Sequence, residues 1–269
     1  MRVGAMLPIA EQMDQAGFES MEFFLSVMFK KYVREHKENP WEWIREGTKR
    51  IKKTRLRYHG GMHSAFEKTP HCILKLLIER LVSYGLTVTR TSNSWNDFAD
   101  FKEEIADLKK TGMDTVANLI YSVSPRHTDE YYARKAKEAA ASNPWRICFK
   151  DVGGLLTPDR ARTLIPIVLK SAGKIPVEFH AHCNSGQAPL CYLEGVKLGM
   201  RILHTAVPPL ANGSSQPSIF NIAHNLRALG YTPMVDLKPL EAVEKHFTAI
   251  ARKSGLPIGK PVEYDQSQY

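Results

Sequence analysis

Three segments between residues 147 and 218 decide the fold, and each runs from apolar residues directly into polar ones. They read Ile147-Cys-Phe-Lys-Asp-Val-Gly-Gly154, Val177-Glu-Phe-His-Ala-His-Cys-Asn-Ser-Gly186 and His204-Thr-Ala-Val-Pro-Pro-Leu-Ala-Asn-Gly-Ser-Ser-Gln-Pro217. Each is typical of a buried strand that ends in a polar loop, so its polar groups would project from a strand end rather than from a helix face. Enzymes of the α/β class place their chemistry at such strand ends.

The rest of the chain alternates expected strands with expected helices. The expected strands are residues 18–25, 55–58, 86–90, 116–123, 146–150, 176–182 and 202–207. Such alternation implies a parallel sheet. Seven strands, each followed by a helix, predict an α/β fold of the (β/α)8 TIM barrel type that lacks its first strand. We expect one domain over residues 1–269, with an irregular tail at 257–269.

Length and composition are those of a soluble globular protein. The 269 residues suit a single α/β barrel, and 43% hydrophobic and 24% charged residues are ordinary values. No signal-peptide pattern opens the chain, and no apolar run approaches the roughly 18 residues of a membrane span. Four cysteines without zinc-finger spacing predict free thiols in a cytoplasmic protein. The net charge of +9 is spread over several helices, which disfavours nucleic-acid binding and suits a carboxylate substrate.

Two histidines and a lysine stand out at the expected strand ends. His180 and His182 are two residues apart on one strand, so both point to the same face. Two imidazoles so placed suit a divalent metal, and ordinary polar histidines at a strand end are the alternative. Lys150 ends another apolar strand, where a lysine is costly unless it is paired, deprotonated or modified; an amine that reaches solvent is the alternative. With the loop at Ser214, these residues follow consecutive strands and would meet at one face of a barrel.

These motifs resemble those of the carboxyltransferase domains of pyruvate carboxylase, oxaloacetate decarboxylase and transcarboxylase, which belong with the HMG-CoA lyase-like metal-dependent barrels. Residues 147–158 resemble the Cys-Ile-Lys-Asp-Met-Ala-Gly-Leu-Leu motif of those domains, residues 180–186 resemble their His-x-His segment, and residues 213–218 resemble their Thr-Ser-Gln-Pro-Ser loop. Residues 6–18, 95–97 and 124–128 are also similar. The similarity covers nearly the whole chain.

The resemblance implies biotin-linked carboxyl transfer to or from a 2-oxo acid of the pyruvate or oxaloacetate type, through an enolate. His180, His182 and a carbamylated Lys150 would bind a divalent ion such as zinc, manganese or cobalt. Carbamylation would turn a costly buried cation into an anionic oxygen ligand. Ser214 would relay a proton between the substrate and biotin, which a partner domain or subunit would carry. We also expect a homo-oligomer.

Four further residues are candidates for supporting roles. Asp151 would lie beside the metal ligands, and Gln216 would contact the substrate from its loop; for both, a structural or surface hydrogen bond is the alternative. His63 and Arg90 would bind the substrate carboxylate, with a loop histidine and a strand-end salt bridge as the alternatives.

Departures from the family pattern fall on the substrate side. The Arg-Asp-x-His-Gln motif at the end of the family's first strand, which supplies an aspartate metal ligand, has no counterpart, and His59-Gly-Gly-Met-His-Ser64 replaces an Arg-Gly-x-Asn sequence. Residues 24–28 replace a Trp-Gly-Gly-Ala-Thr motif, Asn93 replaces an aspartate, and the family's helical extension would follow residues 262–264.

A barrel without its first strand would leave unpaired strand edges, so we expect a piece of a longer polypeptide or a partner that supplies the strand. Two other functions stay open. One is a biotin-independent metal-dependent lyase or aldolase of the same superfamily. The other is a degenerate, non-catalytic barrel that serves as a subunit of a carboxylase assembly.

Overall fold

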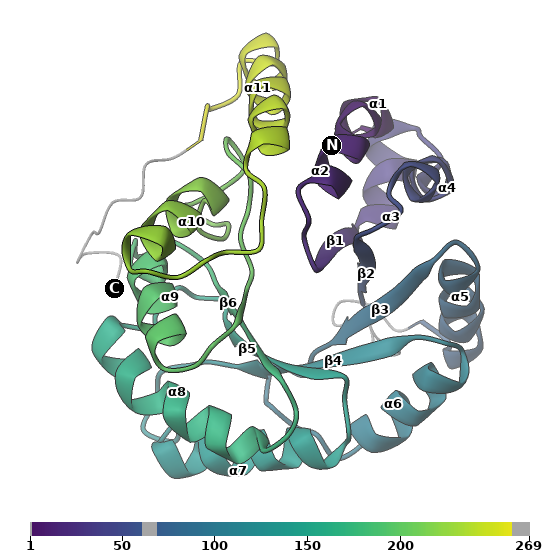
Figure 1. Ribbon diagram of the computed structural model, residues 1–269. Coiled ribbons are helices and arrows are strands. Elements are labelled where there is room, and N and C mark those ends of the chain that lie inside the picture. The colour runs from purple at the N-terminus through teal and green to yellow at the C-terminus, as the bar shows by residue number, and fades with distance from the viewer. Residues whose placement is uncertain (1, 61–68, 260–269) are drawn as a thin grey trace. The chain divides into compact units, whose positions relative to one another are not determined.

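The computed structural model describes residues 2–60 and 69–259, which form two compact units (Figure 1). The first unit comprises the described residues up to Thr91, together with 104–115 and 234–254. The second comprises residues 92–103 and 116–233 and the described residues from 255 onward. Within each unit the strand order follows the chain order.

The first unit is built on three parallel strands, β1 (Ser20–Leu25), β2 (Arg55–His59) and β3 (Leu86–Thr91). Its helical elements are α1 (Val3–Met6), the 3-10 helix η1 (Leu7–Ile9), α2 (Ala10–Gln15), α3 (Met28–Lys31), the π-helix η2 (Tyr32–His36), α4 (Pro40–Arg50), α5 (His71–Ser83), most of α6 (Phe101–Lys110) and α11 (Lys238–Lys253).

Helix α4 starts at Pro40, directly after its N-cap residue Asn39. The Asn39 side chain accepts a hydrogen bond from the backbone N–H of Trp41 at 3.0 Å, and Pro40 occupies the first turn, where its missing N–H costs nothing. The helix then packs on β1 through Trp43, whose ring stacks on Phe23 with 4.5 Å between centroids. The indole Nε1 also donates to the Phe23 carbonyl at 3.2 Å, so this buried donor is satisfied.

Asp14 at the end of α2 fixes the turn that leads into β2. Its carboxylate accepts hydrogen bonds from the backbone N–H groups of Lys52 (2.8 Å), Lys53 (3.0 Å) and Thr54 (2.8 Å). Burial acts to raise the pKa of Asp14, but these three hydrogen bonds favour the charged form more strongly and leave the pKa below its ordinary value. The ionised carboxylate therefore stabilises this turn.

The second unit contains most of β4 (Asp114–Ile120) with β5 (Arg146–Asp151), β6 (Val177–Ala181) and β7 (Ile202–Leu203), all paired in parallel. The helices that follow these strands are α7 (Asp129–Ala141), α8 (Pro158–Ala172), α9 (Ala188–Lys197) and α10 (Ile219–Ala228). The Thr157 side chain caps α8 by accepting a hydrogen bond from the Arg160 N–H at 3.1 Å.

The two faces of β5 and β6 carry different residues. Phe149 pairs in register with Phe179, and their rings pack 5.6 Å apart on the face that α7 and α9 contact. Tyr132 of α7 and Tyr192 of α9 pack on these two rings. Because side chains alternate along a strand, the residues between the phenylalanines face the other way. That opposite face carries two register pairs, Cys148 with Glu178 and Lys150 with His180.

The seven predicted strands are all present, but the last one is shorter than predicted. The sequence predicts an extended segment over residues 202–207, whereas β7 ends at Leu203. The prediction is wrong here because the Ala206 N–H donates to the Pro217 carbonyl at 3.0 Å instead of continuing the pairing with β6.

The single domain over 1–269 stays a prediction, and residues 260–269 of the expected tail lie outside the described residues. No helix in the described part of the chain is long and apolar enough to cross a membrane.

Candidate metal centre

The two predicted histidines converge at the carboxyl end of β6. His180 is only 5% exposed, and its ring centroid lies 5.1 Å from that of His182. The amide Nε2 of Gln216 lies 3.3 Å from Nε2 of His180 and 3.4 Å from Nε2 of His182. Both Nε2 atoms therefore face one hydrogen-bond donor, and an imidazole nitrogen that accepts a hydrogen bond must carry a lone pair.

The tautomer of His182 follows from a second contact. Its Nδ1 lies 2.7 Å from the backbone carbonyl oxygen of Ser214, which can only accept. Nδ1 therefore carries the proton, and Nε2 carries the lone pair that faces Gln216. A carbonyl partner on the far nitrogen is the arrangement that orients metal-binding histidines in proteins.

The donor set fits a divalent metal. Two imidazole lone pairs are directed at one position that a hydrogen-bond donor already contacts, and this position suits a cation equally well. Lys150 is 8% exposed and pairs in register with His180 on the neighbouring strand. As an ammonium group it could not bind a cation, whereas as a carbamate it would supply an oxygen ligand.

The loop after β5 is held against the end of β6. The Asp151 carboxylate, 1% exposed, accepts hydrogen bonds from the backbone N–H groups of Leu155 (3.0 Å) and Leu156 (2.8 Å). Burial raises the pKa of Asp151, and these hydrogen bonds oppose the rise. The turn brings Gly154, at φ +68°, so close to the next strand that an added Cβ would lie 2.7 Å from the His182 carbonyl oxygen. Asp151 thus shapes the loop that contacts the His182 backbone.

A second set of contacts fixes the loop that carries Ser214 and Gln216. The Tyr192 hydroxyl donates to the His204 carbonyl at 2.7 Å and accepts from the Ala181 N–H at 2.9 Å, which joins the ends of β6 and β7. The Cys183 N–H donates to the Ser215 carbonyl at 2.9 Å. These bonds place the loop over the histidine pair. They also explain why Ser214, whose side chain is exposed, contacts His182 through its carbonyl.

Arg90 makes contacts of its own at the end of β3. Arg90 belongs to the first unit, where its Nε lies 2.9 Å from Oε1 of Glu22 and its Nη2 lies 3.3 Å from Nδ1 of His59. The strand-end salt bridge considered as an alternative is therefore present, and substrate binding by Arg90 stays a prediction. His63 lies outside the described residues.

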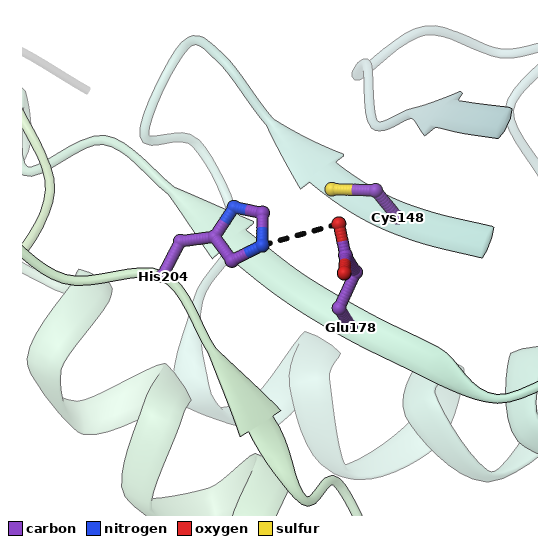
Figure 2. A group of neighbouring side chains, drawn as sticks. All are labelled: Cys148, Glu178 and His204. Carbon is purple, nitrogen blue, oxygen red and sulfur yellow. Dashed lines mark ion pairs between the residues drawn. The ribbon is translucent and has the colours of Figure 1, made fainter. Parts of the chain in front are cut away.

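Sequence reasoning missed a second cluster, which consists of Cys148, Glu178 and His204 (Figure 2). Sγ of Cys148, a carboxylate oxygen of Glu178 and a ring nitrogen of His204 all lie within 4.8 Å of one another. Nε2 of His204 lies 3.1 Å from Oε1 of Glu178, and Nδ1 of His204 lies 3.0 Å from Nδ1 of His180. Glu178 stands two residues before His180, so the period of two along a strand is the signal that could have placed it on the same face.

Together, the fold and the site define an α/β barrel-type protein whose polar groups gather at the carboxyl ends of parallel strands. The model of the HMGL-like family matches residues 1–246, and the chain belongs to this family. The resemblance drawn from the motifs is thereby confirmed.

Known relatives agree with this assignment. The chain is 33% identical over 255 residues to a pyruvate carboxylase subunit of Methanocaldococcus jannaschii, covering 94% of this chain and 45% of that protein. It is 32% identical over 270 residues to the equivalent pyruvate carboxylase subunit of Methanothermobacter thermautotrophicus, covering 98% and 47%. The chain thus spans about half the length of the curated relatives it matches.

A solved structure confirms the fold class. The carboxyl transferase domain from Rhizobium etli pyruvate carboxylase superposes with a TM-score of 0.90 at 21% identity, covering 100% of this chain and 47% of that one. The described residues contain seven parallel strands, one fewer than a complete eight-stranded barrel.

Proposed function

We propose that the chain catalyses carboxyl transfer between biotin and a 2-oxo acid of the pyruvate or oxaloacetate type. The observation that carries the proposal is the convergence of the Nε2 atoms of His180 and His182 on Gln216, beside the buried Lys150. The match to pyruvate carboxylase subunits of two organisms supports the choice of reaction. In this proposal, biotin is carried by a partner domain or subunit.

In this proposal His180, His182 and a carbamylated Lys150 hold a divalent ion. A bound metal of this kind acts as a Lewis acid that polarises a keto group and favours the enolate of the 2-oxo acid. The position of Lys150, buried and in register with His180, supports this role, because a carbamate there would supply an anionic oxygen ligand. Zinc, manganese and cobalt all accept imidazole and oxygen ligands.

The loop above the histidine pair would handle substrate and proton. Ser214 is exposed at the loop surface while its carbonyl orients His182, so its Oγ can meet both reactants. In the direction of carboxylation, Oγ would pass the proton lost from the carbon next to the keto group to the biotin nitrogen that gives up its carboxyl group. The Gln216 amide would give up its contacts with the two imidazoles when they bind the metal, and it would contact the substrate instead. His63 and Arg90 are proposed for the substrate carboxylate.

The proposal is tested by assaying the purified chain for oxaloacetate decarboxylation with and without free biotin. After removal of metal with a chelator and reloading with Mn²⁺, Zn²⁺ or Co²⁺, we expect pyruvate formation that biotin stimulates. Lys150→Ala should abolish it, and the exposed His224→Ala on α10 serves as the matched control that should retain it. Full activity of Lys150→Ala would contradict the proposal.

Two other outcomes would favour the alternatives. Metal-dependent cleavage without any effect of biotin indicates a lyase or aldolase. A chain that binds no stoichiometric metal indicates a degenerate, non-catalytic barrel. The homo-oligomeric state and the cytoplasmic location stay predictions.

A further inference from the structure

The contact between His180 and His204 imposes a choice between the two rings. Their Nδ1 atoms lie 3.0 Å apart, which is a hydrogen-bond distance. A neutral imidazole carries one N–H and one lone pair, so only one of these Nδ1 atoms can bear the proton of this bond. The histidine that donates from Nδ1 presents a lone pair at Nε2, and the other histidine presents an N–H at Nε2. Only the first of the two can bind a metal through Nε2.

Glu178 decides the choice. Its side chain is fully buried, and Oε1 lies 3.1 Å from Nε2 of His204 (Figure 2). Nη1 of Arg146 lies 3.8 Å from the other carboxylate oxygen, so a cation already faces Glu178. An ionised carboxylate can only accept, so in a neutral His204 ring the proton is on Nε2 and Nδ1 accepts. His180 must then donate from Nδ1 and carry its lone pair on Nε2, toward Gln216.

The same reasoning bears on the cluster of Cys148, Glu178 and His204. Thiolate, carboxylate and imidazole form a ligand set that suits zinc, and the three groups lie within 4.8 Å of one another. A metal there would need the lone pair of Nε2 of His204, which would force Nδ1 of His204 to donate to His180 and leave His180 with a proton on Nε2. The two metal sites therefore exclude each other as long as both rings are neutral.

We propose that His204 and Glu178 are positioning residues that hold His180 in the tautomer with the Nε2 lone pair, and so direct the metal to the His180 and His182 pair instead of to Cys148, Glu178 and His204. The proposal rests on the proposed function for the metal at that pair. Neither residue is expected to touch the substrate. Their effect passes through two contacts, from Glu178 to His204 and from His204 to His180.

The first test reads the tautomer directly, in metal-free chain with ¹⁵N-labelled histidines. Nitrogen NMR distinguishes a protonated from an unprotonated ring nitrogen, and a His180→Ala variant assigns the signals. We expect Nδ1–H on His180 and Nε2–H on His204. His204→Leu should give a mixture of His180 tautomers, whereas His204→Asn should preserve the single tautomer because its amide oxygen can accept from Nδ1 of His180. The exposed His224→Leu is the control for loss of a histidine.

The second test measures affinity for Co²⁺ on the same four proteins, which are the unmodified chain, His204→Leu, His204→Asn and His224→Leu. Residues that orient a metal-binding histidine typically contribute 10–100-fold in metal affinity. We expect a loss in that range for His204→Leu, and a loss of only a few-fold for His204→Asn. A structural role alone would weaken binding in both variants and leave the His180 tautomer unchanged.

Two results would overturn the inference. One is an Nε2–H tautomer of His180, or a doubly protonated His204, in the unmodified chain. The other is a thiolate-to-cobalt absorption band that disappears in Cys148→Ser, because it would place the metal in the other cluster. Since the tautomer is read without metal, biotin or substrate, its outcome is independent of whether the chain transfers carboxyl groups.

Discussion

Replacing Gly154 with alanine should disturb the candidate metal centre through the backbone alone. Gly154 has a φ of +68°, and an added Cβ would lie 2.7 Å from the His182 carbonyl oxygen and 3.0 Å from the Asn184 backbone nitrogen. The left-handed conformation costs a non-glycine residue roughly 1–2 kcal/mol. Forcing a methyl group into this packed contact adds about 1–3 kcal/mol. The free energy of unfolding should therefore fall by about 2–5 kcal/mol in total.

Gly230→Ala is the matched control for this substitution. Gly230 lies in the same unit with φ +85°, but an added Cβ meets no atom within 4 Å, so only the conformational cost of roughly 1–2 kcal/mol applies. Urea denaturation measures the two free energies of unfolding, and Co²⁺ titration measures metal affinity. We expect the larger stability loss, and a loss of metal affinity, only in Gly154→Ala. Equal stability losses with unchanged metal affinity in both variants would refute the close approach to His182.

Three other substitutions or treatments address separate parts of the chain. Asp14→Ala should lower the free energy of unfolding by about 2 kcal/mol at pH 7, because three backbone N–H groups lose their acceptor. The pKa of Asp14 lies below its ordinary value, so this contribution to stability is complete above the ordinary pKa and is lost as the pH falls through the folded-state pKa. The difference in urea midpoint between the unmodified chain and Asp14→Ala should therefore shrink at low pH, and a difference that stays constant down to the lowest pH would contradict this prediction. A thiol reagent at pH 8 should label Cys72, which is exposed, and should spare Cys183, because burial raises the pKa of Cys183 to about 12; equal labelling rates would argue against this burial. Ser214→Ala should reduce biotin-stimulated decarboxylation by about 100-fold or more with metal affinity unchanged, while Ser214→Thr should retain most of the activity; full activity in Ser214→Ala would exclude the proton relay.

Local patterns were sufficient for most of the fold. The apolar runs that end in polar residues located all seven strands. The sequence could not give the length of β7, because Ala206 pairs with the loop that returns at Pro217 rather than with β6. That choice depends on where a later segment lies, and no local pattern encodes it.

The candidate site was predictable to a similar extent. The spacing of His180 and His182 placed them on one face, and the register of β5 with β6 brings Lys150 beside them. The roles of Glu178 and His204 were not predictable, because they arise from side-chain distances between two strands and not from spacing along either. Gln216 was expected at the substrate, and its contact with both imidazoles depends on how the loop is held by Cys183 and Ser215.

The central claim is that Nε2 of His180 and Nε2 of His182 bind one divalent metal, and titration of chelator-treated chain with Co²⁺ tests it most directly. The account predicts one metal per chain, with binding lost in both His180→Ala and His182→Ala and retained in His224→Ala. Stoichiometric binding that persists in both of the first two variants would contradict the account.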